Sequence, residues 1–112
     1  MEWTLLAYLL YKVYNKVGNE ISLDIVRNLV FNVLPLKFRV VCYRTEGEFF
    51  DELRYLEKLK LIEIHNDKII VRDVDSLCRI GRFIEGSRLR EISRWFNEII
   101  RRIACAVDCY IP

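Results

Sequence analysis

The chain has 112 residues, a length that suits one small domain and leaves little room for a second. Hydrophobic residues make up 53% of it, against about 45–50% in typical soluble domains even when glycine is counted. We expect the surplus to cover a subunit interface. The longest nearly unbroken apolar run spans residues 5–11, far short of the roughly 20 residues that cross a bilayer. Since no targeting leader is visible either, we expect an intracellular protein without a membrane partner.

The net charge of +2 is unevenly distributed along the chain. Residues 1–75 carry 11 Lys and Arg against 12 Asp and Glu, a net of −1, whereas residues 76–112 carry 7 against 4, a net of +3. All seven cations of the second part are arginines, whose guanidinium groups bind phosphate oxygens bidentately. The asymmetry favours nucleic acid or another acidic partner, although a solvated helix face explains it equally well.

Four cysteines occur, Cys42, Cys78, Cys105 and Cys109, with a single histidine, His65. No Cys-x-x-Cys pair is present, and a structural zinc site needs four suitably spaced ligands. Cys105 and Cys109 are one helical turn apart but would need two distant ligands. We therefore predict no metal and no cofactor. Buried, inert thiols are the first interpretation of the cysteines, and disulfides stay open, with Cys109 the best-placed thiol for a bond between subunits.

Two helices are predicted in the first third of the chain. Residues 3–17 are apolar almost all round, which indicates a heavily buried helix, and Gly18 supplies its C-terminal stop. Ser22 is a suitable N-cap for a second helix, and Pro35 is expected to end it. The apolar positions of this second helix repeat at intervals of three and four: Leu23, Val26, Leu29, Val30 and Val33.

Residues 36–44 alternate in part like a strand, but a short helix or a packed loop fits them equally well. Thr45 then caps a third helix, and Glu48 completes an S/T-x-x-E capping box. Two short β-branched runs, residues 61–65 and 68–72, flank Asn66-Asp67, so a two-stranded hairpin is predicted. The buried side of the third helix is expected to comprise Phe49, Leu53, Leu56 and Leu59.

The last part of the chain is predicted to be helical. A short helix covers roughly residues 75–84, Glu85 and Gly86 interrupt it, and Ser87 caps a longer helix that runs to Tyr110. Apolar positions of the longer helix alternate in spacing between three and four, over about three heptads. We predict that this seam pairs two copies of the chain: Leu89, Ile92, Phe96, Ile99, Ile103, Ala106 and Tyr110.

The order helix, helix, helix, hairpin resembles the winged helix-turn-helix family over roughly residues 3–73. Its most specific part is L-x-x-L-E-x-x-K-L-I-E at residues 53–63, which is similar to the recognition-helix exit and first wing strand of many bacterial and archaeal regulators. Family members usually have glycine at the position of Lys60, because the helix ends there in a left-handed conformation. The appended helix is similar in layout to that of small archaeal winged-helix regulators and proteins of archaeal viruses.

The resemblance implies a mainly helical α+β fold. A winged-helix domain would span residues 1–74 and a helical dimerisation tail residues 75–112, together forming one structural unit. It also implies duplex DNA as partner, held mostly by phosphate contacts, with Arg54 as the candidate base reader. The cations expected to contact DNA are Lys37, Arg39, Arg44, Arg54, Lys58, Lys68, Arg72, Arg88 and Arg90.

A homodimeric transcriptional regulator is therefore the first hypothesis for function. A second is a protein-docking module that uses the third helix, because phosphates would repel an acidic helix. The exposed positions of that helix are mostly acidic: Glu46, Glu48, Asp51 and Glu52 against Arg54 and Lys58. Enzymatic activity is not expected, since the chain has no glycine-rich phosphate loop, no nucleophile elbow and no candidate catalytic triad beyond the single His65.

Overall fold

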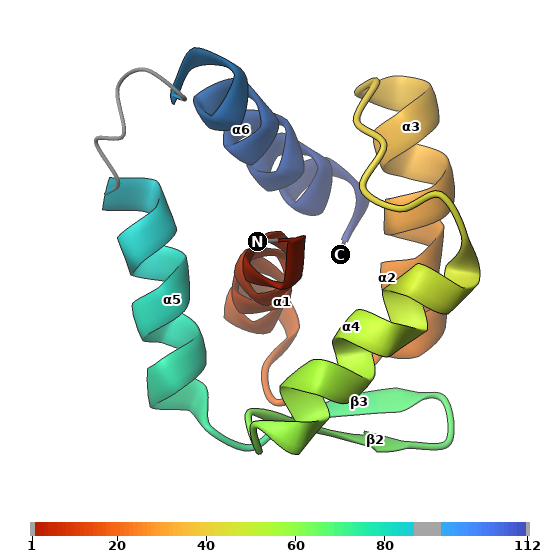
Figure 1. The fold of residues 1–112 in the computed structure, drawn as a ribbon, viewed down its shortest axis with the longest axis vertical. Helices are drawn as coiled ribbons and strands as arrows, with labels where there is room; N and C mark the ends of the chain where they lie inside the picture. The colour runs from red at the N-terminus through yellow and green to blue at the C-terminus, as the bar shows by residue number, and fades with distance from the viewer. Residues whose placement is uncertain (1, 87–92, 112) are drawn as a thin grey trace.

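The computed structural model describes residues 2–86 and 93–111 (Figure 1). Its helices are α1 (Glu2–Val17), α2 (Leu23–Asn28), the π-helix η1 (Leu29–Val33), α3 (Leu34–Lys37), α4 (Glu46–Lys58), α5 (Val74–Gly86) and α6 (Ser93–Tyr110). Its strands are β1 (Glu20–Ser22), β2 (Ile62–His65) and β3 (Lys68–Val71). The predicted mainly helical α+β class is confirmed. Among the described helices, none is both long and apolar enough to span a bilayer.

Helix α1 lies at the centre of the molecule, with α4, α5 and α6 around it (Figure 1). Every side chain from Leu6 to Tyr11 is buried, which is why the sequence of this helix is apolar on all sides. The helix ends because Gly18 adopts a φ of 89° and its N–H donates to the Tyr14 carbonyl at 2.8 Å. The predicted first helix, its burial and its stop are confirmed.

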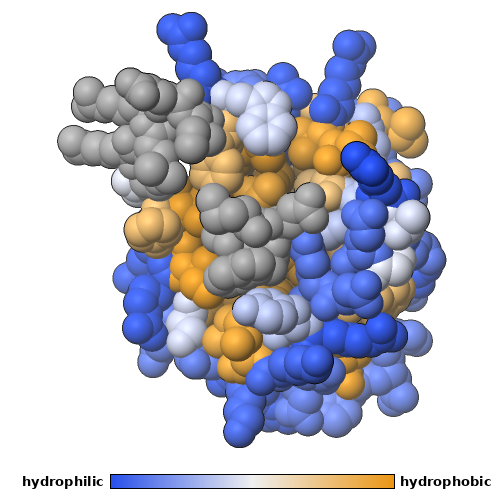
Figure 2. Space-filling view, viewed as in Figure 1, coloured by the Kyte–Doolittle hydropathy of each residue, from blue (hydrophilic) through white to orange (hydrophobic). Residues whose placement is uncertain are grey.

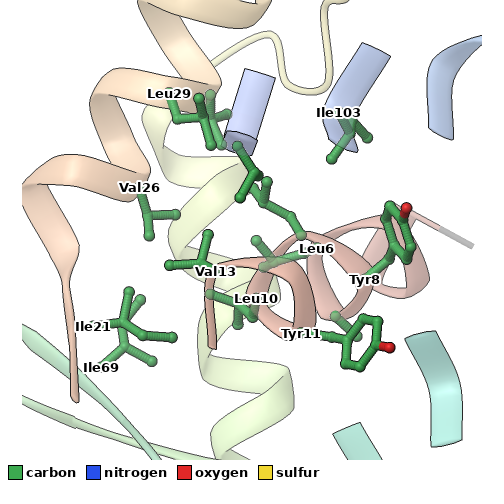
Figure 3. Close-up of a cluster of buried hydrophobic side chains, with 14 of the residues drawn as sticks. Leu6, Tyr8, Leu10, Tyr11, Val13, Ile21, Val26, Leu29, Ile69 and Ile103 are labelled. Atoms are coloured by element: carbon green, nitrogen blue, oxygen red, sulfur yellow. The ribbon is translucent and has the colours of Figure 1, made fainter. Parts of the chain in front are cut away.

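The hydrophobic core joins side chains from all parts of the chain around α1. Figure 3 shows Leu10 of α1 and Val26 of α2 in one cluster with Ile69 of β3 and Ile103 of α6. None of these four side chains is more than 1% exposed. Because α6 contributes to the same cluster as the sheet, the C-terminal helix is part of this core.

The sheet is antiparallel, with β3 in the middle of the order β1-β3-β2. Strands β2 and β3 form the predicted hairpin, in which His65 pairs with Lys68 and Asn66 takes the positive φ of 55°. Strand β1 was not predicted. It has three residues and one buried apolar side chain, Ile21, so it offers no alternation to recognise.

The second predicted helix continues past Pro35, so the prediction that this proline ends it is wrong. Helices α2, η1 and α3 follow one another without a break from Leu23 to Lys37. A proline has no N–H and its ring clashes with the carbonyl four residues earlier. Here Pro35 lies in the first turn of α3, directly after the wider π turn of η1, which supplies the room that a regular turn lacks. The expected apolar positions are all buried: Leu23, Val26, Leu29, Val30 and Val33.

The helical run ends at Lys37 instead, and Arg39, two residues further on, has a φ of 57°. The chain reverses there, and the Val40 N–H donates to the Leu34 carbonyl at 2.9 Å. Residues 38–45 then form an irregular connection to α4. Of the three alternatives for residues 36–44, the strand is wrong, and a short helix followed by a packed loop is observed.

Helix α4 ends in a Schellman motif. Lys60 has a φ of 62°, its N–H donates to the Glu57 carbonyl at 2.9 Å, and the Leu61 N–H donates to the Leu56 carbonyl at 3.1 Å. The left-handed conformation expected at Lys60 is confirmed, although lysine adopts it at a cost. Leu59 was expected on the buried side but is 47% exposed, since the helix stops before its side chain reaches the core.

Helix α5 begins with a side-chain cap. The Asp73 carboxylate accepts hydrogen bonds from the Ser76 N–H at 3.0 Å and from the Ser76 hydroxyl at 2.7 Å. These bonds hold the pKa of Asp73 below its ordinary value. Along its buried side the helix packs on α1, and Gly81 lies directly against the ring of Tyr11. The absence of a side chain at Gly81 lets the two helices approach closely.

Two cations attach α6 to the rest of the chain. Lys16 Nζ, at the end of α1, donates to the carbonyls of Asp108 and Ile111 at 2.9 and 3.0 Å. Arg102 Nη1 donates to the Phe38 carbonyl at 3.1 Å. Carbonyls past a helix end lack intrahelical partners, and cations stabilise them. Helix α6 is therefore docked on its own chain at both contacts.

Gly81→Ala tests the close packing of α5 on α1. The added β-carbon would lie 2.2 Å from a ring carbon of Tyr11, so the helices must separate, and we expect the free energy of unfolding to fall by about 1–3 kcal/mol. Gly86→Ala, in the same helix, meets nothing within 4 Å and should leave stability unchanged or slightly raised. Urea unfolding followed by circular dichroism measures both. Equal losses in the two variants would contradict the proximity of Gly81 and Tyr11.

Candidate functional site

Helix α4 crosses the face of the molecule that Figure 1 presents, between α3 and the β2–β3 hairpin. Thr45 caps it as predicted, since its side-chain oxygen accepts from the Glu48 N–H at 3.2 Å. Its inward side chains, Phe49, Leu53 and Leu56, are fully buried, so the opposite side faces solvent. We call the exposed residues of that side the α4 outer face: Asp51, Arg54, Tyr55, Lys58 and Leu59.

Two carboxylates of α4 are paired with arginines. Glu46 Oε1 lies 2.8 Å from Arg27 Nη2 of α2, and Asp51 Oδ1 lies 3.5 Å from Arg54 Nη1 one turn further along α4. Arg27 also lies over the ring of Phe50, 5.8 Å from its centroid. The first pair fixes the start of α4 against α2, and the second neutralises part of the charge on the α4 outer face.

The other three carboxylates of α4 accept hydrogen bonds from neighbouring parts of the chain. Their donors are the Arg44 N–H for Glu48 (3.4 Å), the Tyr43 hydroxyl for Glu52, and the Ile64 N–H for Glu57 (2.9 Å). The acidic residues thus position α4 against α2, the preceding connection and β2. Because each has a structural role, the acidic composition of the helix does not by itself decide whether the α4 outer face repels phosphates.

Four exposed cations lie in α4 or within two residues of its ends. Arg44 precedes the helix, Arg54 lies in its middle, and Lys58 and Lys60 lie at its end, all exposed. Within residues 2–86 and 93–111, Arg54 is the one of these four that takes part in an ion pair. Sequence reasoning treated Lys60 as a helix stop and missed it as a surface cation. The signal that was present is its spacing of two residues from Lys58, which places two lysines at the exit of one helix.

The two predicted cations of the hairpin are already paired. Lys68 Nζ lies 2.7 Å from Glu20 Oε1, and this contact raises the pKa of Lys68. Glu63 accepts hydrogen bonds from His65, at 2.5 Å, and from Arg72, and these bonds hold the pKa of Glu63 below its ordinary value. A phosphate that contacts Lys68 or Arg72 would therefore have to displace a carboxylate.

The remaining predicted cations fall into two groups. Lys37 and Arg39 are exposed at the end of α3, and neither takes part in an ion pair within the part of the chain that the structure describes. Arg88 and Arg90 lie outside the described residues. Of the predicted contacts, Arg54 and Lys58 thus share the α4 outer face, and Arg44 lies just before the helix.

The heptad seam of α6 is corrected at two positions. Ile103 and Ala106 are 1% and 0% exposed within the chain itself, so they are not available to a second copy. They pack in the core beside α1 and η1. A helix that packs on helices of its own chain needs the same spacing of three and four as a helix in a coiled coil. For this reason the pattern did not distinguish the two arrangements.

Other seam positions have different surroundings. Phe96 and Ile99 are half-buried against the core. Tyr110 is 46% exposed, and its ring packs edge-on against Phe38, with the ring centroids 6.1 Å apart. The predicted interface residues Leu89 and Ile92, and the predicted cap Ser87, lie outside the described residues.

The cysteines differ in exposure. Cys105 and Cys109 are exposed free thiols on α6, so the interpretation as buried, inert thiols is wrong for these two, and Cys42 and Cys78 are half-buried. Among the described residues, no group of three or more His, Cys, Asp or Glu side chains is arranged to hold a metal ion.

A groove of about 250 Å³ separates the start of the second helical run from the end of α6. Its polar side chains are one carboxylate, Asp24, one amide, Asn28, and one phenol, Tyr110. The residues that line it are Asp24, Ile25, Asn28, Leu29, Val33, Tyr110 and Ile111.

Comparison with protein families, with curated proteins and with solved structures gives no match. The function is therefore inferred from the chain's own residues. The α4 outer face and its neighbouring cations are one feature of the described surface on which charge, exposure and a rigid support coincide.

The pKa of Glu63 predicts how the hairpin responds to acid. Its folded-state pKa is lowered, so the stabilisation by its hydrogen bonds is fully present above the unfolded pKa of about 4.3 and is lost as pH falls through the folded value. We expect wild type to exceed Glu63→Gln in free energy of unfolding at pH 7, and the difference to shrink below about pH 4. Urea titrations at several pH values measure it. A difference that stays constant down to pH 3 would show that the charge of Glu63 contributes nothing.

Proposed function

We propose that the protein binds duplex DNA through the α4 outer face, as a homodimeric winged-helix regulator of transcription. The single observation that carries this proposal is the set of cations around α4: Arg44, Lys58 and Lys60 are exposed and take part in no ion pair within the described residues. The element order also supports it, since α4 precedes the β2–β3 hairpin as a recognition helix precedes a wing.

In this proposal the flanking cations contact phosphates. Each phosphate that Arg44, Lys58 or Lys60 neutralises releases condensed counterions, so these contacts give affinity without reading sequence. The predicted contacts Lys37 and Arg39 lie at the end of α3, apart from the α4 outer face, and are not part of this proposed contact. Arg88 and Arg90 stay predicted contacts, because they lie outside the described residues. The paired hairpin cations Lys68 and Arg72 would exchange a carboxylate for a phosphate on binding.

Arg54 is the proposed base reader. It lies in the middle of the α4 outer face with its side chain about two-thirds exposed, and Asp51 lies 3.5 Å from its guanidinium group. An arginine in the major groove donates to O6 and N7 of guanine. Because one arginine reads few bases, we expect modest sequence preference, part of which would come from DNA shape.

A second candidate function is protein docking through α4. Tyr55 and Leu59 are 46% and 47% exposed on the α4 outer face, and contacts with phosphates give no reason for apolar side chains there. Partly exposed aromatic and aliphatic side chains beside charged ones are typical of the centre of a protein interface. This candidate would replace DNA binding if the following test fails.

Two variants with the same net charge test DNA binding. Lys58→Gln with Lys60→Gln removes two cations from the exit of α4, whereas Arg79→Gln with Arg82→Gln removes two exposed cations from α5. We expect the first to reduce the slope of log Kd against log salt by about 3.6 for the homodimer, since each of the two chains loses two phosphate contacts and each contact contributes about 0.9. The second should leave the slope unchanged. Fluorescence anisotropy with a labelled duplex at salt concentrations from about 50 to 200 mM measures both.

Arg54→Gln completes this experiment. It should reduce the difference in affinity between preferred and random duplexes while changing the salt slope little. If wild-type protein at about 10 micromolar forms no complex with duplex DNA in about 50 mM salt, where phosphate contacts are strong, DNA binding is wrong. The docking candidate is then adopted.

We further propose that the homodimer buries Phe83 of α5 and Trp95 of α6. Both side chains are 71% exposed in the single chain, and large aromatic residues contribute strongly to subunit interfaces. Because Ile103 and Ala106 are already buried in the core, we propose Phe83 and Trp95 as interface residues in their place. The high apolar content of the chain agrees with a covered surface of this kind.

Light scattering tests the dimer. Wild-type protein is expected to have about twice the chain mass of 13.5 kDa at micromolar concentration, and Phe83→Ser with Trp95→Ser should shift it to the monomer mass, because the lost apolar burial stabilised the pair. Tyr55→Ser, which removes an exposed ring from α4, serves as control and should remain dimeric. A wild-type monomer would rule out the dimer, and a dimeric double variant would place the interface elsewhere.

A further inference from the structure

A second surface stands out where the chain turns from α3 into the connection that leads to α4. We call it the α3 corner and define it as Leu36, Lys37, Arg39 and Val41. Leu36 is 76% exposed and Val41 is 73% exposed, the highest values for large hydrophobic side chains within the described residues. Figure 2 shows hydrophobic side chains at the upper right, over α3, with strongly hydrophilic side chains beside them. The corner is thus both apolar and basic.

The corner is held rigidly by the parts of the chain beneath it. Val40, between its two exposed ends, is buried, and its N–H is bonded to the Leu34 carbonyl at 2.9 Å. The Phe38 carbonyl accepts from Arg102 of α6 at 3.1 Å, and the Phe38 ring packs on Tyr110. Leu36 and Val41 therefore face water on a backbone that is fixed by hydrogen bonds. A preorganised surface loses little conformational entropy when a partner binds.

The charges of the corner restrict what kind of partner can cover it. Lys37 and Arg39 are exposed and have no carboxylate partner within residues 2–86 and 93–111. Phosphates of DNA would satisfy these two cations but would leave Leu36 and Val41 in water. A protein segment that carries both carboxylates and apolar side chains satisfies the cations and buries the apolar groups together.

We propose that the α3 corner docks an acidic segment of a partner protein, whose apolar side chains cover Leu36 and Val41 while its carboxylates pair with Lys37 and Arg39. The corner is separate from the α4 outer face. This docking therefore stands independently of DNA binding and gives the protein a second contact. In a DNA-bound regulator, such a contact would connect the DNA to another protein.

The test uses a fluorescein-labelled synthetic peptide in which leucines recur among glutamates. In one control peptide serine replaces every leucine, and in a second lysine replaces every glutamate. Anisotropy titrations with the full chain should give an affinity for the acidic, leucine-containing peptide at least about tenfold higher than for either control. The affinity should also fall as salt is raised, since the cations are exposed. Equal affinity for the three peptides, or no binding, overturns the proposal.

Matched variants locate the binding site. Leu36→Ser with Val41→Ser should weaken peptide binding by about tenfold or more and leave the affinity for duplex DNA unchanged. Val17→Ser with Ile25→Ser removes two exposed aliphatic side chains elsewhere and should leave peptide binding unchanged. Equal losses in both variants overturn the assignment to the corner. Flotation with phosphatidylserine vesicles tests a lipid surface as the alternative partner. If the wild type binds no peptide but floats with the vesicles, and Leu36→Ser with Val41→Ser abolishes flotation, a lipid surface replaces the protein partner.

Discussion

The arrangement of the other helices depends on α1, because all its side chains from Leu6 to Tyr11 are buried in succession. A helix that is apolar on every side cannot lie on a surface and must be enclosed. In this chain α4, α5 and α6 enclose it (Figure 1). The close approach of α5 requires that Gly81 has no side chain. Lys16 at the end of α1 holds α6 through two hydrogen bonds. The requirement to bury one helix therefore sets the positions of three others.

The enclosure of α1 determines which side of the C-terminal helix α6 is buried within the chain. Ile103 and Ala106 meet α1 and η1 within the same chain, so the inner side of α6 is used by the fold and only its outer side remains for partners. Large aromatic groups, Phe83 and Trp95, stay exposed on α5 and α6. Apolar surface of this size costs free energy in water, and this cost is the reason for our proposal that a second copy covers it.

Acidic and basic residues have different roles in this structure. Carboxylates of α4 hold neighbouring elements, as Glu46 does with Arg27 and Glu57 with the Ile64 N–H, whereas several cations face solvent without an ion pair among the described residues. A surface of modest net charge thereby presents exposed positive groups near α4 and at the α3 corner, as well as on α5. Counting charges along the sequence could not reveal this, because the count treats a carboxylate inside the structure and one on the surface alike.

Local interactions explain what the sequence determined by itself. The cap at Thr45, the stops at Gly18 and Lys60 and the turn at Asn66 each depend on residues a few positions apart, and all four took the expected conformation. Tertiary structure decided the rest. The strand β1 exists only because β3 lies beside it, and Pro35 is tolerated because of the π turn of η1. The sequence of α6 left open whether the helix packs on its own chain or on a second copy, because both kinds of packing require the same spacing of apolar residues. The exposure of Leu36 and Val41 likewise follows from the place where the chain reverses after α3. That place is held by contacts between α3, the connection to α4 and α6, which no short stretch of sequence encodes.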